Sequence, residues 1–343
     1  MSIHELKNTA QRLMDEGKGL LAMDESLGTC NKRFKALGIP QTEEYRRKYR
    51  ELIVTTPNLE DFISGTILFE ETIYQKTDAG VPFLTVLKEK GIIPGIKVDQ
   101  GTVPLAGFPN EKITEGLDGL RGRLASYYEM GLRFAKWRSV INIDAESPTR
   151  VGIKANASTL ARYAALCQEA GIVPIVEPEV LMDGDHTLQK CAAVTQDVLK
   201  EVFNALYDQQ VSLGGMILKP NMVLPGIDCA DQEDSEAIAE KTISSFLKVV
   251  PAAVGGVAFL SGGQPFMLAS ERLNVMQLRF GQIMPWPLTF SFSRAIQEPA
   301  LEMWKGEDRN KEVAQMELYH RAKCNSAARN GTYSVEMEKI KSV

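Results

Sequence analysis

The sequence is poor in the residues that build metal and redox sites. Its three histidines, His4, His186 and His320, lie far apart, which argues against a zinc enzyme. The five cysteines are an odd number, and no two of them have the CxxC spacing of a zinc or dithiol site. A chain of 343 residues also needs no disulfides to hold a core. We therefore expect no metal, no disulfide framework, and reduced thiols in the cytoplasm.

Long hydrophobic runs and a strong excess of one charge are also missing. The longest apolar run, residues 249–260, contains proline and glycine and is far shorter than the roughly 20 residues of a membrane-spanning helix. The first residues carry charge from His4 onward and show the apolar spacing of a helix, so we expect an N-terminal helix and no signal peptide. A formal net charge of −5 gives no general attraction to phosphate backbones. Neither a membrane nor a nucleic acid is therefore expected as a partner.

What the sequence does contain is a regular alternation of short apolar runs and longer amphipathic segments. This alternation predicts βα units. The expected strands are 19–24, 65–71, 95–99, 134–143, 172–179, 215–220, 254–261 and 288–294. The expected helices include 114–128, 160–169, 188–206, 237–249 and 313–328.

The spacing of the units indicates how they assemble. Successive steps of 39, 41, 40 and 42 residues separate the polar residues that close the middle strands, which are Asp99, Arg138, Glu179, Lys219 and Ser261. Eight units without a glycine-rich dinucleotide fingerprint favour a closed barrel over an open doubly wound sheet. The predicted fold is therefore α/β, a single (β/α)8 TIM barrel over residues 1–343, with an N-terminal helix and a short C-terminal tail over 330–343.

Polar residues close all eight expected strands. They are Asp24, Glu71, Lys97, Asp99, Lys136, Arg138, Glu177, Glu179, Lys219, Ser261 and Arg294. A charge inside an apolar strand is costly unless it is paired, and the carboxyl ends of barrel strands converge on the face that carries the active site. Three strands hold two such residues spaced two apart, so both members of each pair are expected to point inwards. The sequence predicts a mouth lined with charges of both signs.

Lys219 is the candidate nucleophile in this mouth. It closes an apolar strand, where burial and neighbouring cations disfavour the charged amine. A neutral amine attacks a carbonyl to give a Schiff base, which draws electrons from an adjacent C–C bond as that bond breaks. Such chemistry also needs an acid/base, for which Glu177 and Glu179 are candidates. Either glutamate could instead neutralise the neighbouring cations Lys136 and Arg138.

Two loops have the composition of phosphate sites. Ser261-Gly262-Gly263-Gln264 and the region ending in Arg294 follow strands seven and eight, where barrels of this kind often bind phosphate. A second group, residues 24–33, offers hydroxyls and two cations after strand one. If both loops bind phosphate, the substrate is a sugar with a phosphate at each end.

Strings that run in order along the chain, from about residue 19 to residue 333, resemble class I fructose-1,6-bisphosphate aldolase. This family is the metal-free Schiff-base enzyme of glycolysis, gluconeogenesis and carbon fixation. The shared strings are LLAMDES (20–26), ILFEETIYQK (67–76), GIKVDQG (95–101), VPLAG (103–107), GLDGL (116–120), FAKWR (134–138), GIVPIVEPE (171–179), LKPNMV (218–223), FLSGGQ (259–264) and LTFSFSRA (288–295).

The resemblance implies a role for each of these polar residues. Lys219 would form the Schiff base with the C2 ketone of fructose-1,6-bisphosphate, and Glu177 would be the acid/base of imine formation with Glu179 beside it. Lys136 would stabilise charge near the breaking bond, and Asp24 would help to deprotonate the C4 hydroxyl. The phosphate at the ketose end would bind Ser261, Gly262 and Arg294. The other phosphate would bind Ser26, Thr29 and Lys97. Arg138, Gly263 and Ser293 complete the expected substrate contacts. No cofactor is implied, and a homotetramer is expected.

The sequence departs from the family pattern at three places. Thr29 stands where a serine is usual, and Ser293 stands where many members have glycine. Many members also end in a tyrosine that assists proton transfer at C3, whereas this chain ends in valine and Tyr333 lies well before the terminus. We therefore expect another group or water to perform that proton transfer.

Three alternatives stay open at this point. A metal-dependent aldolase would need histidine ligands at strand ends, and none of the three histidines closes a strand. Another Schiff-base sugar-phosphate aldolase, for example one acting on sedoheptulose bisphosphate, would use the same lysine. A noncatalytic scaffold would need none of the polar residues of the mouth.

Overall fold

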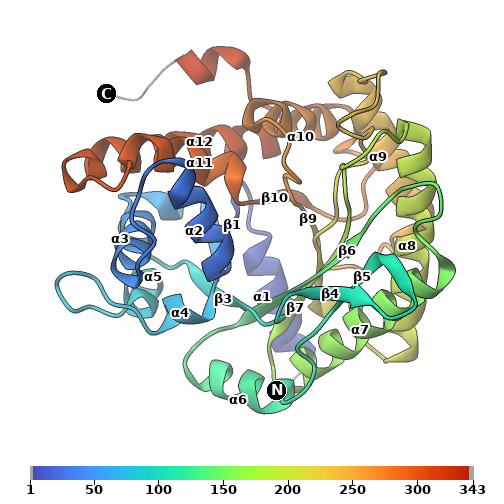
Figure 1. The fold of residues 1–343 in the computed structure, drawn as a ribbon, viewed down its shortest axis with the longest axis horizontal. Coiled ribbons are helices and arrows are strands. Elements are labelled where there is room, and N and C mark those ends of the chain that lie inside the picture. Colours follow the sequence, from blue (N-terminus) through green and yellow to red (C-terminus); the bar gives the residue numbers. More distant parts are fainter. Residues whose placement is uncertain (1–2, 340–343) are drawn as a thin grey trace.

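The computed structural model describes residues 3–339. In this part of the chain, eight parallel strands close into a barrel in the order β1-β10-β9-β8-β7-β6-β3-β2 (Figure 1). The barrel strands are β1 (Gly19–Met23), β2 (Ile63–Leu68), β3 (Ile93–Lys97), β6 (Phe134–Ile141), β7 (Val173–Val180), β8 (Ile217–Leu218), β9 (Val257–Phe259) and β10 (Leu288–Phe292). Each overlaps one expected strand, so the barrel prediction is confirmed.

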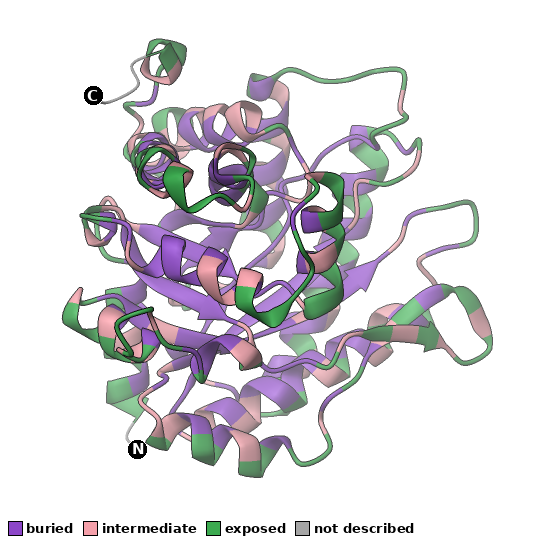
Figure 2. Cartoon of the chain, turned by 60° about the vertical axis from the view of Figure 1, so that its left-hand side comes forward, coloured by how far each residue is buried: buried purple, intermediate pink, exposed green. Residues whose placement is uncertain are grey.

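Helices surround the barrel and bury one face against it, while the opposite face is exposed (Figure 2). They are α1 (Ile3–Leu13), α2 (Leu27–Ala36), α3 (Glu43–Val54), α4 (Glu70–Ile73), α5 (Phe83–Glu89), α6 (Leu120–Glu129), α7 (Arg150–Glu169), α8 (Leu188–Asp208), α9 (Ser235–Val249), α10 (Phe266–Phe280), α11 (Arg294–Trp304) and α12 (Lys311–Arg329). Short 3-10 turns are η1 (Leu59–Asp61), η2 (Leu213–Gly215), η3 (Asp308–Asn310) and η4 (Val335–Lys339). The expected helix over 114–128 begins only at Leu120, and the one over 160–169 begins ten residues earlier, at Arg150.

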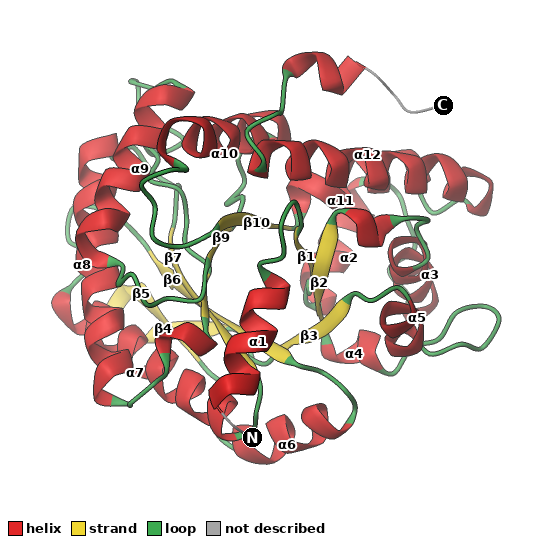
Figure 3. Ribbon diagram, turned by 180° about the vertical axis from the view of Figure 1, so that it is seen from behind, coloured by secondary structure: helices red, strands yellow, loops and turns green. Residues whose placement is uncertain are grey.

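The N-terminal helix α1 closes one end of the barrel. Its buried residues Leu6, Ala10 and Leu13 join an inner core with strand residues such as Ile67 and Phe134. Figure 3 shows α1 lying across this end of the barrel. Because this end is filled with apolar side chains, the polar residues of the strands gather at the opposite end, where the strands finish.

A second, larger core lies between the strands and the helices. Trp137 of β6 packs on Tyr163 of α7 with their ring centroids 5.5 Å apart, and both side chains are fully buried. The Tyr163 hydroxyl donates to the carbonyl oxygen of Ala135 at 2.6 Å. Such packing holds β6, which carries two of the expected site residues, against its helix.

A two-stranded hairpin interrupts the alternation after β3. It consists of β4 (Thr102–Leu105) and β5 (Phe108–Thr114), which pair antiparallel with the turn at Gly107, φ +83. The sequence did not predict it because most of its residues are exposed or half exposed and its apolar residues form no continuous run. Its first residue, Thr102, borders the cavity at the barrel mouth.

Three further expectations concern the rest of the chain. All five cysteines lie in the described residues and are free. Among the described helices, none combines the length and the apolar character needed to cross a membrane. The expected C-terminal tail over 330–343 is described as far as Lys339, and it contains η4; residues 340–343 lie outside the described part.

Candidate active site

A cavity of about 680 Å³ lies at the mouth of the barrel, where the strands end. The expected site residues that line it are Asp24, Ser26, Thr29, Lys97, Lys136, Arg138, Glu177, Glu179, Lys219, Ser261, Gly262, Ser293 and Arg294. Of the expected set, Gly263 is not in the lining. The strand ends at this face of the barrel therefore bring together nearly all the residues that the sequence singles out. The strands concerned are β1, β3, β6, β7, β8, β9 and β10.

Four buried charges form a continuous chain across the cavity. Lys136 Nζ lies 2.7 Å from Asp24 Oδ2 and 3.0 Å from Glu177 Oε2. The other oxygen of Glu177, Oε1, lies 3.1 Å from Lys219 Nζ. The four side chains alternate in sign, and each is at most about a tenth exposed. Each of these four charges thus has an opposite charge within hydrogen-bond distance, which offsets the loss of hydration.

The alternation of charge sets the protonation of these groups. Burial by itself raises the pKa of Asp24, but the ammonium groups of Lys136 and Lys219 outweigh it and lower the pKa to about 2. The same balance lowers the pKa of Glu177. Burial lowers the pKa of Lys136, but Asp24 and Glu177 outweigh it and raise the pKa above its ordinary range. At neutral pH both carboxylates are therefore ionised and Lys136 is a fixed cation.

The other residues of the inward-pointing pairs form two ion pairs outside this chain of four charges. Arg138 Nε lies 2.5 Å from Glu179 Oε2, and Lys97 Nζ lies 2.6 Å from Asp99 Oδ1. The backbone N–H of Arg138 also donates to Asp99 Oδ2 at 3.3 Å. The two glutamates that the sequence left as alternatives thus differ in their partners: Glu177 forms ion pairs with Lys136 and Lys219, whereas Glu179 pairs with Arg138.

The start of α2 forms one side of the cavity. Ser26 caps this helix and its Oγ accepts from the N–H of Thr29 at 3.3 Å, and the two hydroxyls lie 3.1 Å apart. Glu25, to which the sequence analysis gives no role, is buried and pairs with Arg33 at 2.6 Å and Arg50 at 2.7 Å. Its position beside Asp24 in the string LLAMDES is the feature of the sequence that could have identified it as part of the site.

The loops after β9 and β10 form the neighbouring part of the cavity wall, because β10 pairs with β1. The exposed guanidinium of Arg294 lies over Gly263, where an added Cβ would come within 2.7 Å of Nη2. Ser293 has φ −107, so the serine at this position does not need the conformational freedom of glycine. Its hydroxyl donates to Glu25 Oε1 at 3.0 Å, which ties this loop to the end of β1.

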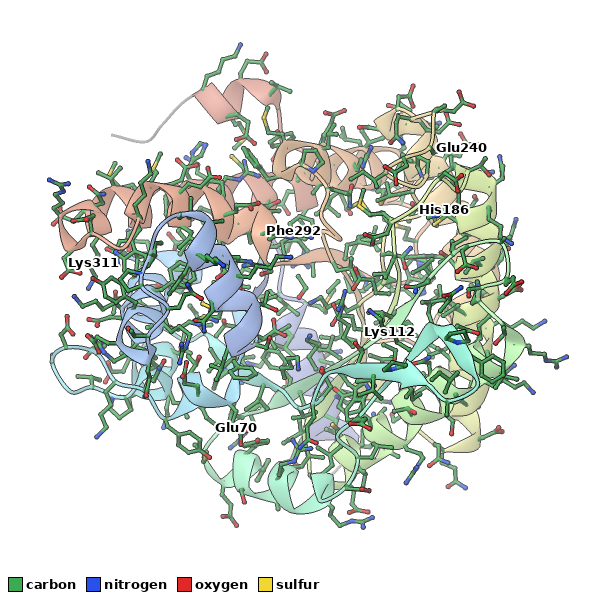
Figure 4. All side chains as sticks on the ribbon, in the orientation of Figure 1. Glu70, Lys112, His186, Glu240, Phe292 and Lys311 are labelled. Carbon is green, nitrogen blue, oxygen red and sulfur yellow. The ribbon has the colours of Figure 1, made fainter. Side chains whose placement is uncertain are left out.

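Two residues considered in the sequence lie elsewhere. Glu71, expected at the end of the second strand, lies in α4 and pairs with Arg46 of α3 at 2.6 Å, so the prediction that it faces the mouth is wrong. His186 lies in the loop before α8, away from Phe292 at the end of β10 (Figure 4). The lining also contains Asp99, Lys32 and Arg33, which the sequence places near the mouth without a separate role. It further contains Glu25, Glu298 and Glu302, to which the sequence analysis gives no role.

One cluster of potential metal ligands lies away from the mouth. The ligand atoms of His320, Cys324 and Glu338 all lie within 4.8 Å of one another. The Glu338 carboxylate is already paired with the buried guanidinium of Arg321, and it accepts a hydrogen bond from the hydroxyl of Tyr333 at 2.9 Å. These contacts identify the cluster as the anchor of η4 on α12. Tyr333 is buried in this anchor and does not line the cavity.

Comparison with known proteins agrees with this geometry. The family model described as fructose-bisphosphate aldolase class-I matches residues 5–342. A probable fructose-bisphosphate aldolase class 1 of Xylella fastidiosa is 53% identical over 97% of this chain and 99% of its own length. Cytosolic fructose-bisphosphate aldolase 4 of Arabidopsis thaliana is 50% identical over 96% of this chain and 84% of its own.

A solved structure gives the same result. The fructose-bisphosphate aldolase of Plasmodium falciparum, crystallised with TRAP and a small-molecule inhibitor, has a TM-score of 0.94 and 47% identity, and the match covers 96% of this chain and 95% of that one. At this level of identity, fold and sequence point to the same relationship. The chain belongs to the class I fructose-bisphosphate aldolase family.

Proposed function

We propose that the chain catalyses the reversible cleavage of fructose-1,6-bisphosphate to dihydroxyacetone phosphate and glyceraldehyde-3-phosphate through a Schiff base on Lys219. The observation that carries this proposal is the contact of 3.1 Å between Lys219 Nζ and Glu177 Oε1 in the barrel mouth. An amine that is held against a carboxylate, and sheltered from water, has a proton acceptor ready when a carbonyl arrives.

Imine formation follows from this contact with its protons balanced. The Lys219 ammonium gives a proton to Glu177, and the neutral amine attacks the C2 carbonyl to form a carbinolamine. Glu177 returns the proton to the carbinolamine oxygen, which leaves as water. The product is a protonated imine beside an ionised Glu177, so the site regains the charge it had before the substrate entered. Lys136 stays charged throughout, because Asp24 remains an ionised partner at 2.7 Å while Glu177 carries the proton.

Cleavage of the C3–C4 bond uses the same chain of charges. The C4 hydroxyl gives up its proton as the bond breaks, and the electron pair moves through C3 and C2 to the imine nitrogen, forming an enamine. Asp24 is the proposed acceptor of the hydroxyl proton, and its low pKa keeps it ionised and ready to accept a hydrogen bond. Lys136, 2.7 Å from Asp24, is placed to stabilise negative charge that develops on the C4 oxygen.

The two phosphates are assigned to two different groups of loops at the mouth. The ketose-end phosphate is proposed to bind Ser261, Gly262, Gly263, Ser293 and Arg294. The other phosphate is proposed to bind Ser26, Thr29 and Lys97. Glu179 and Arg138, which bond each other, are proposed to orient the sugar between these two subsites.

Borohydride trapping tests the proposed function directly. The protein is incubated with dihydroxyacetone phosphate and EDTA, reduced, digested and mapped by mass spectrometry. We expect the adduct on Lys219, no adduct in Lys219→Met, and a full adduct in Lys248→Met, which changes an exposed lysine of α9. Cleavage that continues without an adduct and stops with EDTA would replace the Schiff-base mechanism with a metal-dependent one. Absence of both adduct and cleavage would favour the scaffold alternative.

We further propose a cytoplasmic location, a homotetramer and a single structural domain. The location is supported by the relatives named as cytosolic. The tetramer is carried over from the family, and light scattering after size exclusion measures it. The single domain is supported by closure of the barrel between β1 and β10, the first and last strands in the chain. It predicts one cooperative unfolding transition.

A further inference from the structure

Arg272, in α10, is a buried cation that pairs with no carboxylate among residues 3–339. The residue is buried, at 8% exposure, and within the described part of the chain its Nε has no hydrogen-bond partner. Its one hydrogen bond to these residues runs from Nη1 to Gln264 Oε1, at 2.6 Å. Arg279 in the same helix differs, because it is partly exposed and pairs with Glu236. Burying a guanidinium without a carboxylate partner costs free energy, so the hydrogen bond to Gln264 calls for an explanation.

Gln264 links Arg272 to the loop after β9. Its Nε2 donates to the carbonyl oxygen of Ser261 at 3.0 Å, and its backbone N–H donates to the same oxygen at 3.0 Å. A guanidinium can only donate hydrogen bonds, so the Gln264 amide must turn its acceptor, Oε1, towards Arg272. The Nε2 group is thereby directed at Ser261.

The held carbonyl sets the direction of the next N–H. The Ser261–Gly262 peptide is trans, and in a trans peptide the C=O and N–H point in opposite directions. Because the Ser261 carbonyl faces Gln264, the N–H of Gly262 faces the other way, and Gly262 lines the cavity. Gly262 and Gly263 have φ values of +60 and +92, and within the described chain neither N–H donates to a protein acceptor. These donors are free for a ligand.

We propose that Arg272 is a positioning residue for the phosphate at the ketose end of the substrate. By fixing the Gln264 amide it holds the Ser261 carbonyl, and so it aims the Gly262 N–H into the subsite. The proposal rests on the function proposed above, which assigns this loop to that phosphate. The ligands affected are those that carry this phosphate, namely the ketose bisphosphate and dihydroxyacetone phosphate. Glyceraldehyde-3-phosphate uses the other subsite and is unaffected.

Two variants separate this role from a purely structural one. Arg272→Met keeps an unbranched, apolar stem and removes the guanidinium that donates to Gln264. It leaves no buried carboxylate unpaired, so thermal stability is expected to be unchanged or higher. Gln264→Glu keeps the shape and an acceptor for Arg272 but has no side-chain N–H for the Ser261 carbonyl, so that oxygen keeps only the backbone N–H of residue 264. Arg279→Met is the matched control in the same helix.

The measurement is the dissociation constant of dihydroxyacetone phosphate, by titration calorimetry, together with steady-state kinetics. For Arg272→Met and Gln264→Glu we expect the dissociation constant and the KM for fructose-1,6-bisphosphate to rise about tenfold, as for loss of one charge-assisted hydrogen bond. The kcat and the KM for glyceraldehyde-3-phosphate in the condensation direction should change less than twofold. Arg279→Met should match the parent throughout.

Each other outcome counts against the proposal. Unchanged affinity in both folded variants overturns it, and a loss in Gln264→Glu alone shows that Gln264 acts without Arg272. If Arg272→Met does not fold, Arg272→Gln, which is shorter and cannot reach Gln264, is measured in its place. Borohydride trapping of the parent tests the proposed mechanism separately. A parent that binds dihydroxyacetone phosphate without forming an adduct on Lys219 contradicts that mechanism. The ratio of the dissociation constants of variant and parent still tests the role of Arg272.

Discussion

Lys219 and Glu177 face each other at 3.1 Å between Nζ and Oε1, on the adjacent strand ends of β8 and β7. The sequence predicts cations around Lys219 and a carboxylate near it. The structure shows that this carboxylate is shared with a second lysine, Lys136, at 3.0 Å. The amine therefore has a proton acceptor at hydrogen-bond distance, and that acceptor is kept ionised by the neighbouring cation.

Replacing Glu177 with glutamine tests this relationship. The glutamine side chain would keep nearly the same shape but could not take the ammonium proton, so we expect adduct formation with dihydroxyacetone phosphate to slow by about 10²–10⁴-fold. Rapid-quench borohydride trapping measures the rate. Glu169→Gln, at an exposed ion pair with Arg121, is the control and should react like the parent. An unchanged rate in Glu177→Gln would assign the acid/base role to another residue.

The lowered pKa of Asp24 predicts that the free energy of unfolding falls in acid. Its pKa is lowered to about 2 in the folded chain from an ordinary 3.8, so its ionised form favours folding. This contribution is fully present above about pH 4 and is lost as the pH falls towards 2. We therefore expect the difference in unfolding free energy between the parent and Asp24→Asn to shrink over that range. Urea unfolding at a series of pH values measures it; a difference that is constant with pH would contradict the assignment.

Tyr333 is expected to have no part in proton transfer at C3. Its hydroxyl is committed to Glu338 at 2.9 Å, its side chain is 7% exposed, and it does not line the cavity. Tyr333→Phe should leave hydrogen exchange at C3 of bound dihydroxyacetone phosphate unchanged, with a stability loss of about 0.5–1.5 kcal/mol from the missing hydrogen bond. Release of tritium from the labelled substrate checks this. Abolished exchange would show that Tyr333 reaches the site.

Much of the fold could be predicted because it depends on local pattern. Apolar runs of strand length, separated by amphipathic helices, recur eight times, and their burial against a common core follows from that repetition. The polar residues at the strand ends could also be predicted as one site, since the strands of a barrel all finish at the same end. The error at Glu71 arose because β2 ends at Leu68, before this residue, and a short helix turns the side chain towards Arg46.

Other features could not be predicted because they depend on register and on contacts between distant segments. Arg138 of β6 lies beside Glu177 in the sheet, yet its guanidinium bonds Glu179, while Lys136 reaches Glu177. Strand register and the directions of the side chains decide between these pairings. The hairpin β4–β5 was missed for a different reason, since its strands bury little apolar surface and so carry no strong hydrophobic signal.

The sequence by itself determined the barrel, the end at which its polar residues gather, and the family, because these follow from periodicity and from colinear strings of residues. Tertiary structure alone decided which charges meet. It joined Asp24, Lys136, Glu177 and Lys219 into one alternating chain, and it gave Arg272 one hydrogen-bond partner among residues 3–339, Gln264. The physical reason is that electrostatic and hydrogen-bond energies depend on distances of a few ångströms, which only the folded arrangement of strands and helices sets.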